Sequence, residues 1–304
     1  MKSSIPNYAE TILKKANQRT IKKMTKIPFP EISTLVGEEE ELTVILSDWQ
    51  LGHKTRSFNL GVAKTRVEEL CHSIATIIEI QRKDHPVKNI NVFLEGDFVQ
   101  NEAVGYLVDL SELEAILIDQ VFGYAVPYLA QTIEFLGKNF ENVNVWSCRG
   151  NHGRGDRQNS EKTNWDDVIY RSLDLMFKNT KRIKFNLTQD FYNIATIMGW
   201  NYLLAHGDQV RGGSYGIPLY ALLQRMLRWA TSLPEKWDVL CCGHWHNFAY
   251  LEQNNQFLIV NGTLVSDDDY VRKQYGWNCS TSQVIFGVHK NRPITSLYRI
   301  DFRG

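Results

Sequence analysis

The strongest constraint on the fold is that five apolar, strand-like runs each end in side chains that bind metal ions well. In chain order, these side chains are Asp48, Asp97, Asn151, His206, and the pair His244 and His246. In α/β proteins, the carboxyl ends of the strands form the crevice in which ligands collect. The five segments are therefore predicted to meet at one edge of the fold, although they are spread over some 200 residues.

Strand-like and helical patterns alternate along the chain and then give way to successive strands. The first part predicts strands at 42–46, 90–94 and 143–147, and helices at 61–82, 109–138 with a break at Pro127, and 161–178. The second part predicts a helix at 214–232 and strands at 184–186, 191–198, 201–205, 239–242, 249–253, 257–261, 283–289 and 294–301. Strand and helix units followed by an antiparallel stretch predict an α/β fold with two sheets and helices outside them.

The length and charge distribution suggest one large domain behind a basic arm. With 304 residues and 43% hydrophobic composition the chain can bury a large core, and the motif order favours residues 41–304 as a single domain. Residues 1–40 are predicted to form a basic helix and linker, since residues 1–30 carry a net charge of 7 − 1 = +6. Such an arm is typical either of a solvated or self-packing helix or of a segment that contacts nucleic acid or a partner.

The cysteines and the apolar runs of the sequence predict the cellular compartment of the protein. The five cysteines, an odd number, show no metal-finger spacing and indicate a reducing environment. The sequence has no apolar run that resembles a signal peptide or a membrane span. We therefore predict a cytoplasmic protein without a membrane partner. The sequence makes no prediction about protein partners.

The donor types in the five segments suit two divalent metal ions. Carboxylate, amide and imidazole groups in this mixture are typical ligands of Mn, Fe or Zn. Asp97 is the best candidate for a carboxylate that bridges both ions, because the small Gly96 lets its turn enter a crowded centre. Asp48 would complete one ion and Asn151 the other. The two histidines of the last segment are two residues apart, so both project from one side of a strand end, one toward each ion.

The third segment also supplies candidates for catalysis and substrate binding. His152 follows Asn151 directly and is predicted to lie beside the metals, where it could act as the general acid or as a hydrogen-bond partner of the ligands. Arg149 and Arg154 flank this turn and are predicted either to bind a phosphate oxygen of the substrate or to be solvated surface residues. The remaining histidines show no partner pattern and are predicted to be surface or structural residues: His53, His72, His85 and His289.

Together, these segments resemble the calcineurin-like metallophosphoesterase superfamily over about residues 42–265. The resemblance implies a four-layer α/β/β/α sandwich of two mixed sheets, with a dinuclear metal site at the strand ends. It implies that Asp48 and His246 hold one ion and that Asp97 is shared. It assigns the remaining ligands to the other ion: Asn151, His206 and His244. His152 takes the general-acid position of the family.

One position departs from the family pattern. The first family segment is usually Asp-x-His, whereas this chain has Asp48-Trp49-Gln50. Gln50 is therefore predicted to be a weak ligand, because a neutral carbonyl oxygen is a poorer donor for Zn than for Mn or Mg. Mn is the favoured ion, with Mg, Fe and Zn as alternatives. His53 would replace the missing imidazole if the loop turned back.

The reaction favoured by these features is hydrolysis of a phosphodiester in nucleic acid or a nucleotide, most readily by a nuclease that uses a metal-activated hydroxide. The turn at 96–101 lacks the arginine that Ser/Thr protein phosphatases carry there, which disfavours a phosphoprotein substrate. The stretches 206–218 and 261–264 are similar to phage-encoded metallophosphoesterases labelled as DNA-processing enzymes.

Nearby aromatic and basic residues would either stack on an unpaired strand and contact its phosphates or belong to the core and an ordinary helix face. They are Trp49, Phe98, Tyr215, Trp229 and Trp245, with Arg211, Arg225 and Arg228. Two alternative functions stay open. The first is a phosphatase of small nucleotides or phosphomonoesters. The second is a catalytically weak interaction module on the same fold.

Overall fold

The computed structural model describes residues 37–102, 110–155, 163–211, 216–268, 272, 276 and 278–302. The chain divides into two units, Met1–Leu35 and Val36–Gly304. The predicted basic helix and linker at 1–40 therefore lies almost entirely outside the described residues. The second unit contains two mixed β-sheets and the helices that cover them.

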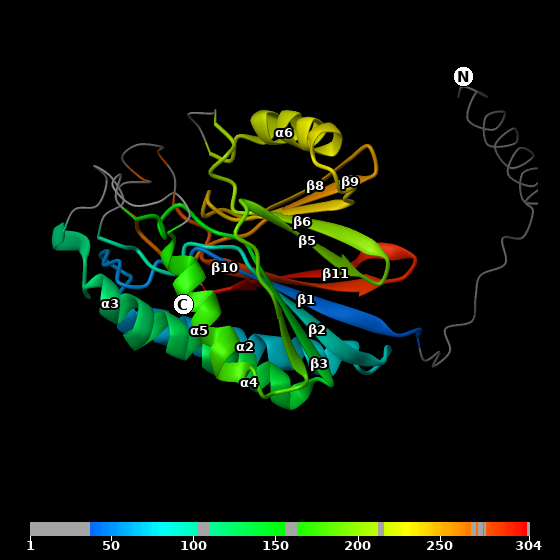
Figure 1. Cartoon of the computed structure of the whole chain (residues 1–304), viewed down its shortest axis with the longest axis horizontal. Coiled ribbons are helices and arrows are strands. Elements are labelled where there is room, and N and C mark those ends of the chain that lie inside the picture. Colours follow the sequence, from blue (N-terminus) through cyan, green and yellow to red (C-terminus); the bar gives the residue numbers. More distant parts are fainter. Residues whose placement is uncertain are drawn as a thin grey trace, which may run out of the picture. The chain divides into compact units, whose positions relative to one another are not determined.

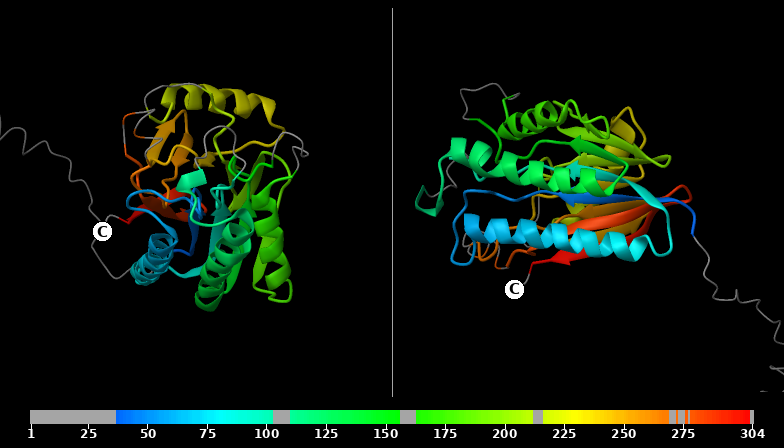
Figure 2. Two further views of the ribbon diagram at one scale, coloured as in Figure 1. Left: turned by 90° about the vertical axis from the view of Figure 1, so that its left-hand side faces the viewer. Right: turned by 90° about the horizontal axis from the view of Figure 1, so that it is seen from below.

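The first sheet has six strands in the order β11-β10-β1-β2-β3-β4. Four of them are parallel, namely β1 (Glu40–Leu46), β2 (Val87–Leu94), β3 (Asn142–Ser147) and β4 (Ile183–Asn186). The antiparallel strands β10 (Ser282–His289) and β11 (Arg292–Asp301) extend the sheet beyond β1. Figure 2 shows three helices lying side by side on one face, α2 (Leu60–Gln81), α4 (Val126–Asn139) and α5 (Trp165–Phe177).

The second sheet has five strands in the order β5-β6-β7-β9-β8. Its parallel centre consists of β6 (Trp200–Ala205), β7 (Val239–Cys242) and β9 (Gln256–Val260). Its antiparallel edges are β5 (Tyr192–Ile197) and β8 (Ala249–Gln253). Helix α6 (Leu219–Ser232) covers the outer face, so Figure 1 shows four layers. The predicted α/β/β/α sandwich of two mixed sheets is confirmed.

The central strands of both sheets are apolar on both faces because both faces are covered. In β1, Val44 belongs to the core under α2, α4 and α5, whereas its neighbour Ile45 belongs to the core between the sheets. In β6, Leu203 faces the core under α6 and Leu204 faces the other sheet. Successive side chains of a strand point to opposite faces, so buried strands in such layered folds read as continuous apolar runs.

The helix predicted at 109–138 differs most from the structure. Residues Leu110–Glu112 form a 3₁₀ turn, and one helical run then extends through α3 (Leu117–Asp119), the π-helical segment η3 (Gln120–Ala125) and α4. The predicted break at Pro127 is wrong, since the proline lies in the first turn of α4. Val126 donates its N–H to the carbonyl of Val121, five residues back. This wider π turn directly precedes the proline, which has no N–H to donate, and the helix continues.

None of the helices in the described residues combines the length and apolar character needed to cross a bilayer. All five cysteines lie within the described residues, and each is a free thiol.

Candidate metal centre

The five predicted segments converge at the carboxyl ends of the parallel strands, toward the left-hand end of the layers in Figure 1. The loops after β1, β2 and β3 come from the first sheet, and the loops after β6 and β7 come from the second. Apart from the weak candidate Gln50, each sheet supplies three of the predicted ligands: Asp48, Asp97 and Asn151 from the first, and His206, His244 and His246 from the second. The centre is therefore shared between the two sheets.

The tightest group of donors surrounds His206. Its Nε2 atom lies 2.8 Å from Asp97 Oδ2 and 3.1 Å from Asn151 Oδ1. Donor atoms of Asp97, His206 and His244 all lie within 4.8 Å of one another. These four side chains are the set that the family resemblance implies for one ion, and the structure brings them together.

A hydrogen bond orients His206, and burial and nearby charges shift the pKa values of His206 and His244. His206 donates Nδ1–H to the carbonyl of Glu95 at 2.7 Å, which directs Nε2 at the other donors. Burial lowers the pKa of His206, but Asp97 outweighs burial and raises that pKa to about 10. Burial and the nearby His206 lower the pKa of His244 to about 4, so its imidazole is neutral at pH 7. A divalent ion in this group would take the place of the proton between His206 and Asp97.

Asp48, Gln50 and His246 form the second group. His246 Nε2 lies 3.5 Å from Asp48 Oδ1 and 3.1 Å from the Gln50 amide nitrogen. The Asp48 carboxylate accepts the backbone N–H of His244 at 3.1 Å, which orients it. Gln50 is 2% exposed, and its Oε1 has no hydrogen-bond partner among the described residues. The amide nitrogen of Gln50 is the atom that contacts His246, and its unsatisfied buried oxygen is a donor that a divalent ion could use; the role of Gln50 as a weak ligand stays a prediction.

His53 is a buried residue, and within the described residues it belongs to no cluster of metal-binding side chains. Its backbone N–H donates to the Gln50 carbonyl at 3.0 Å, so the loop does turn back. The ring, however, has its Nε2 3.9 Å from Glu112 Oε2. Burial lowers the pKa of His53 to about 4. The structural interpretation of His53 therefore fits better than a surface position or a replacement ligand.

His152 lies beside the predicted ligands. Its backbone N–H donates to Asp97 Oδ1 at 2.7 Å, and its Nδ1 lies 3.0 Å from the Gln100 carbonyl. Its Nε2 lies 3.2 Å from the same Gln50 amide nitrogen that contacts His246. Because a carbonyl can only accept, Nδ1 carries a proton and Nε2 faces the predicted ligand Gln50. The residue is half-buried.

Arg149 and Arg154 are both engaged in ion pairs. Arg149 Nε lies 2.9 Å from Asp167 Oδ2, and both side chains are about one-tenth exposed. Arg154 pairs with Asp208, two residues after His206, and its side chain is 59% exposed. Of the two, Arg154 is thus the arginine that solvent, and hence a substrate, can reach. A role in substrate binding stays a prediction for both.

The aromatic residues considered for base stacking are mostly core residues. Trp49 and Phe98 are fully buried and pack edge to face with ring centroids 5.3 Å apart. Trp229 lies on the buried face of α6. Trp245 is half-buried and packs against His244 with ring centroids 5.3 Å apart. Tyr215 lies outside the described residues.

The turns that carry the ligands are strained and closely packed. Positive φ angles, which cost energy in non-glycine residues and cluster at functional sites, occur at five predicted ligand positions: Asp48 (55°), Gln50 (41°), Asp97 (57°), His244 (71°) and His246 (54°). Gly96 has φ +85°, and a Cβ there would lie 2.2 Å from the Gly150 nitrogen. A Cβ on Gly243 would lie 2.2 Å from Asp48 Oδ2. These glycines therefore leave the space into which the ligand side chains fit.

Sequence reasoning missed Asp166, a fully buried carboxylate at the start of α5. It accepts backbone N–H groups from Asp97 at 3.2 Å, Phe98 at 3.3 Å and Gly150 at 2.9 Å, and so joins two ligand turns. Burial and the neighbouring Asp97 raise its pKa to about 7. The sequence offered only a local reason for this aspartate. Asn164 caps α5 by accepting the Asp166 N–H, and an aspartate in the first turn of a helix is ordinarily explained by the helix dipole.

A second group of potential ligands was also missed. Donor atoms of His246, Asp268 and Cys279 lie within 4.8 Å of one another. Asp268 lies in an acidic run and Cys279 lies 33 residues after His246, so no local spacing connects them.

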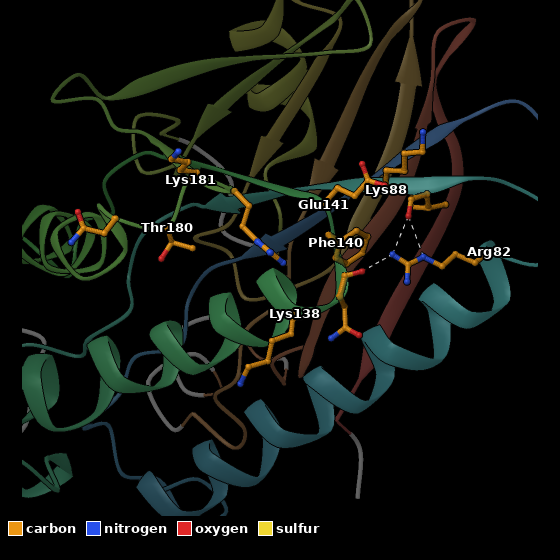
Figure 3. A pocket seen from close by; sticks show the side chains of 11 residues that line it. Arg82, Lys88, Lys138, Phe140, Glu141, Thr180 and Lys181 are labelled. Atoms are coloured by element: carbon orange, nitrogen blue, oxygen red, sulfur yellow. Dashed lines mark hydrogen bonds between the residues drawn. The ribbon is translucent and has the colours of Figure 1, made fainter.

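A basic pocket of about 940 Å³ lies near the amino ends of β2 and β4, and Figure 3 shows its lining. Its cations are Arg82, Lys88, Lys138, Lys181 and Arg182. Arg82 donates to the carbonyls of Val87 and Asn139, and Arg182 donates to that of Gly137. Cations near the carboxyl end of a helix interact favourably with its dipole, which accounts for both arginines without a ligand.

No family model matches the chain, and no curated protein matches it. Among solved structures, the chain is similar to an archaeal phosphodiesterase, with 13% identity, a TM-score of 0.38, and coverage of 85% of this chain and 99% of that one. It is also similar to vacuolar protein sorting 29 from Cryptosporidium parvum, with 12% identity, a TM-score of 0.39, and coverage of 86% and 99%. A predicted phosphoesterase from Streptococcus pneumoniae has 9% identity, a TM-score of 0.37, and coverage of 86% and 98%. At such TM-scores the likenesses support no inference about function.

Proposed function

We propose that this protein is a calcineurin-like metallophosphoesterase that holds two divalent ions, with Mn favoured. The observation that carries the proposal is the position of Asp97, whose Oδ2 lies 2.8 Å from His206 and whose Oδ1 accepts the His152 N–H. Its backbone carbonyl also accepts the N–H of Gln50, which belongs to the other ligand group. When bound, two ions at such a centre activate water and neutralise phosphoryl oxygens.

His152 is the residue that we propose as general acid. Nδ1–H is held by the Gln100 carbonyl, so the proton for the leaving oxygen must come from Nε2 of the protonated ring. Nε2 faces the ligands through its contact with Gln50. The backbone bond to Asp97 fixes the position of the ring relative to the centre.

For the substrate we propose a phosphodiester of nucleic acid or a nucleotide. The exposed guanidinium of Arg154 lies beside the loop of His206, where it can neutralise a phosphate. Trp245, half-buried and next to His244, offers an aromatic face on which a base can stack. The basic segment at residues 1–30 adds a second cationic region in the sequence.

The substrate class is tested by comparing hydrolysis of bis-p-nitrophenyl phosphate with that of p-nitrophenyl phosphate, with Mn added. We expect faster hydrolysis of the diester, and cleavage of single-stranded DNA in preference to cyclic nucleotides. Faster hydrolysis of the monoester would favour the phosphatase alternative. Purified protein that neither binds metal nor hydrolyses any of these compounds would favour the interaction module.

The role of His152 is tested with His152→Ala, and His72→Ala, which changes an exposed histidine on α2, is the control. The first variant should keep its metal but lose roughly 10²–10⁴-fold in rate on diesters with poor leaving groups, because those groups need protonation. Nitrophenyl esters should lose much less. An equal loss on both substrate types would show that His152 positions the site and is not the acid.

A further inference from the structure

Cys279 and Asp268 lie close to His246, and Cys279 contacts the ring nitrogen that is not turned toward Asp48. His246 Nε2 contacts Asp48 Oδ1 at 3.5 Å and the Gln50 amide at 3.1 Å. Its other nitrogen, Nδ1, lies 3.8 Å from Cys279 Sγ. With the Asp268 carboxylate, these groups form a cluster of donors within 4.8 Å of one another. His246 therefore presents its two nitrogens to two different sets of ligands.

We propose that His246 Nδ1, Asp268 and Cys279 form a separate zinc-binding site beside the dinuclear centre. Zinc bonds of about 2.3 Å to sulfur and about 2.0 Å to nitrogen, at a tetrahedral angle, place the two atoms roughly 3.5 Å apart. The observed distance of 3.8 Å between Cys279 Sγ and His246 Nδ1 is close to this expected separation of two zinc ligands. Thiolate, imidazole and carboxylate together select Zn²⁺ over Mn²⁺ or Mg²⁺, because thiolate is a soft ligand.

The cluster is held in place and can be reached from solvent. The backbone N–H of Ser280 donates to the carbonyl of His246 at 2.7 Å, which ties the Cys279 segment to the histidine loop. His246 and Asp268 are each 7% exposed. Cys279 also lines an open pocket of about 540 Å³, through which an ion can enter. Three protein ligands with an open side leave a fourth position for water.

Zinc at this site affects the weaker of the two predicted metal positions. A neutral imidazole has one lone pair, so His246 ligates either through Nδ1 or through Nε2. When Nδ1 binds zinc, Nε2 carries the proton and is lost as a ligand beside Asp48, where Gln50 already replaces an imidazole. The group around His206 does not use His246 and keeps its ion. Zinc is therefore expected to lower Mn occupancy at the Asp48 position only.

The test uses Co²⁺ as a spectroscopic substitute for zinc. Thiolate ligation gives Co²⁺ a near-ultraviolet charge-transfer absorption that carboxylate, amide and imidazole ligands do not give. The full-length protein should show this absorption, and one equivalent of Zn²⁺ should remove it. Cys279→Ser should abolish it, whereas Cys71→Ser, which changes another half-buried free thiol, should keep it. Asp268→Asn should weaken zinc binding at least about 10-fold, since even outer partners of a ligand contribute that much.

A second measurement needs no variant. Zn²⁺ should slow the alkylation of Cys279 by iodoacetamide, read by peptide mass spectrometry, and should leave the alkylation of Cys71 unchanged. If Co²⁺ binds without the charge-transfer absorption and Zn²⁺ gives no protection, Cys279 and Asp268 are only hydrogen-bond partners of His246, and the proposal is wrong. Neither readout depends on hydrolysis, so failure of the proposed activity and failure of the zinc site are distinguishable.

Discussion

Among single residues, Asp97 is the one whose carboxylate we propose to serve both ions: the carboxylate contacts His206, and the backbone carbonyl of Asp97 accepts from Gln50 and so places the residue beside the other group. Asp97→Ala should therefore lose both ions and all hydrolysis. Asp48→Ala should mainly empty the position that it shares with Gln50 and His246. Metal content measured by mass spectrometry on the two purified variants tests this. Retention of both ions in Asp97→Ala would contradict the bridging assignment.

His206 makes metal binding dependent on pH. Its pKa, raised to about 10, lies above the unfolded value of about 6.5. The stability that it contributes to the metal-free protein is therefore complete below about pH 6.5 and is lost as the pH rises toward 10. Metal binding depends on pH in the opposite direction, because the ion must displace that proton. The affinity for Mn should therefore rise up to about tenfold per pH unit between about pH 6.5 and 10.

Calorimetric titration in two buffers of different ionisation enthalpy measures the proton released with each ion. Wild-type protein should release about one proton near neutral pH. His206→Asn should bind Mn weakly and without this release. An affinity for Mn that does not change between about pH 6.5 and 8.5 would show that the ion does not replace the proton of His206.

The positions of the predicted ligands followed from local motifs, whereas contacts between residues far apart in the sequence did not. The ligand side chains stand directly after apolar runs, so their convergence follows from the ends of parallel strands. The pairing of Arg149 with Asp167, and of Arg154 with Asp208, depends on how α5 and the loop after β6 pack. Nothing in the spacing of these residues indicates either pair.

At the level of elements, the central strands such as β1 and β7 were predictable because they are short apolar runs covered on both faces. The helix around Pro127 was not predictable in detail. A proline usually ends or kinks a helix, but here the π turn at Gln120–Ala125 precedes it and the helix continues. Whether a chain compensates for a missing N–H in this way depends on the packing of the helix against the sheet.

The turn between β2 and Asp97 depends on Gly96. Gly96 and Gly199 have nearly the same φ, +85° and +91°, but a Cβ on Gly96 would lie 2.2 Å from a backbone nitrogen, whereas a Cβ on Gly199 would meet nothing within 4 Å. Gly199→Ala should therefore cost only the backbone strain, about 1–2 kcal/mol of unfolding free energy. Gly96→Ala should cost roughly 4 kcal/mol or more and lose metal binding, because backbone must move.

Urea unfolding of the two glycine variants, followed by circular dichroism, measures this difference. Gly199→Ala should retain the wild-type metal content. Equal destabilisation by the two substitutions would mean that the loop at Gly150 moves away at little cost, and the close approach would then not explain the glycine.

At the scale of the whole described domain, the centre joins the two sheets. Hydrogen bonds already cross between them, as from His206 Nδ1 to the Glu95 carbonyl and from the Asn193 amide to the Ser147 carbonyl. Because each sheet supplies half of the predicted ligands, bound ions would add bonds across the same boundary. Binding to the folded state alone stabilises it by about 2.7 kcal/mol when the ion concentration is 100 times Kd.

Mn at that excess should therefore raise the thermal midpoint by roughly 5–10 °C, since about 1 kcal/mol shifts the midpoint of a domain of 150–250 residues by about 2–4 °C. Chelation with EDTA should reverse the shift. Asp97→Ala should melt at the same temperature with and without Mn, because the residue that serves both ions is missing. A shift of the same size in Asp97→Ala would place the stabilising ions elsewhere. The centre would then not be what links the two sheets.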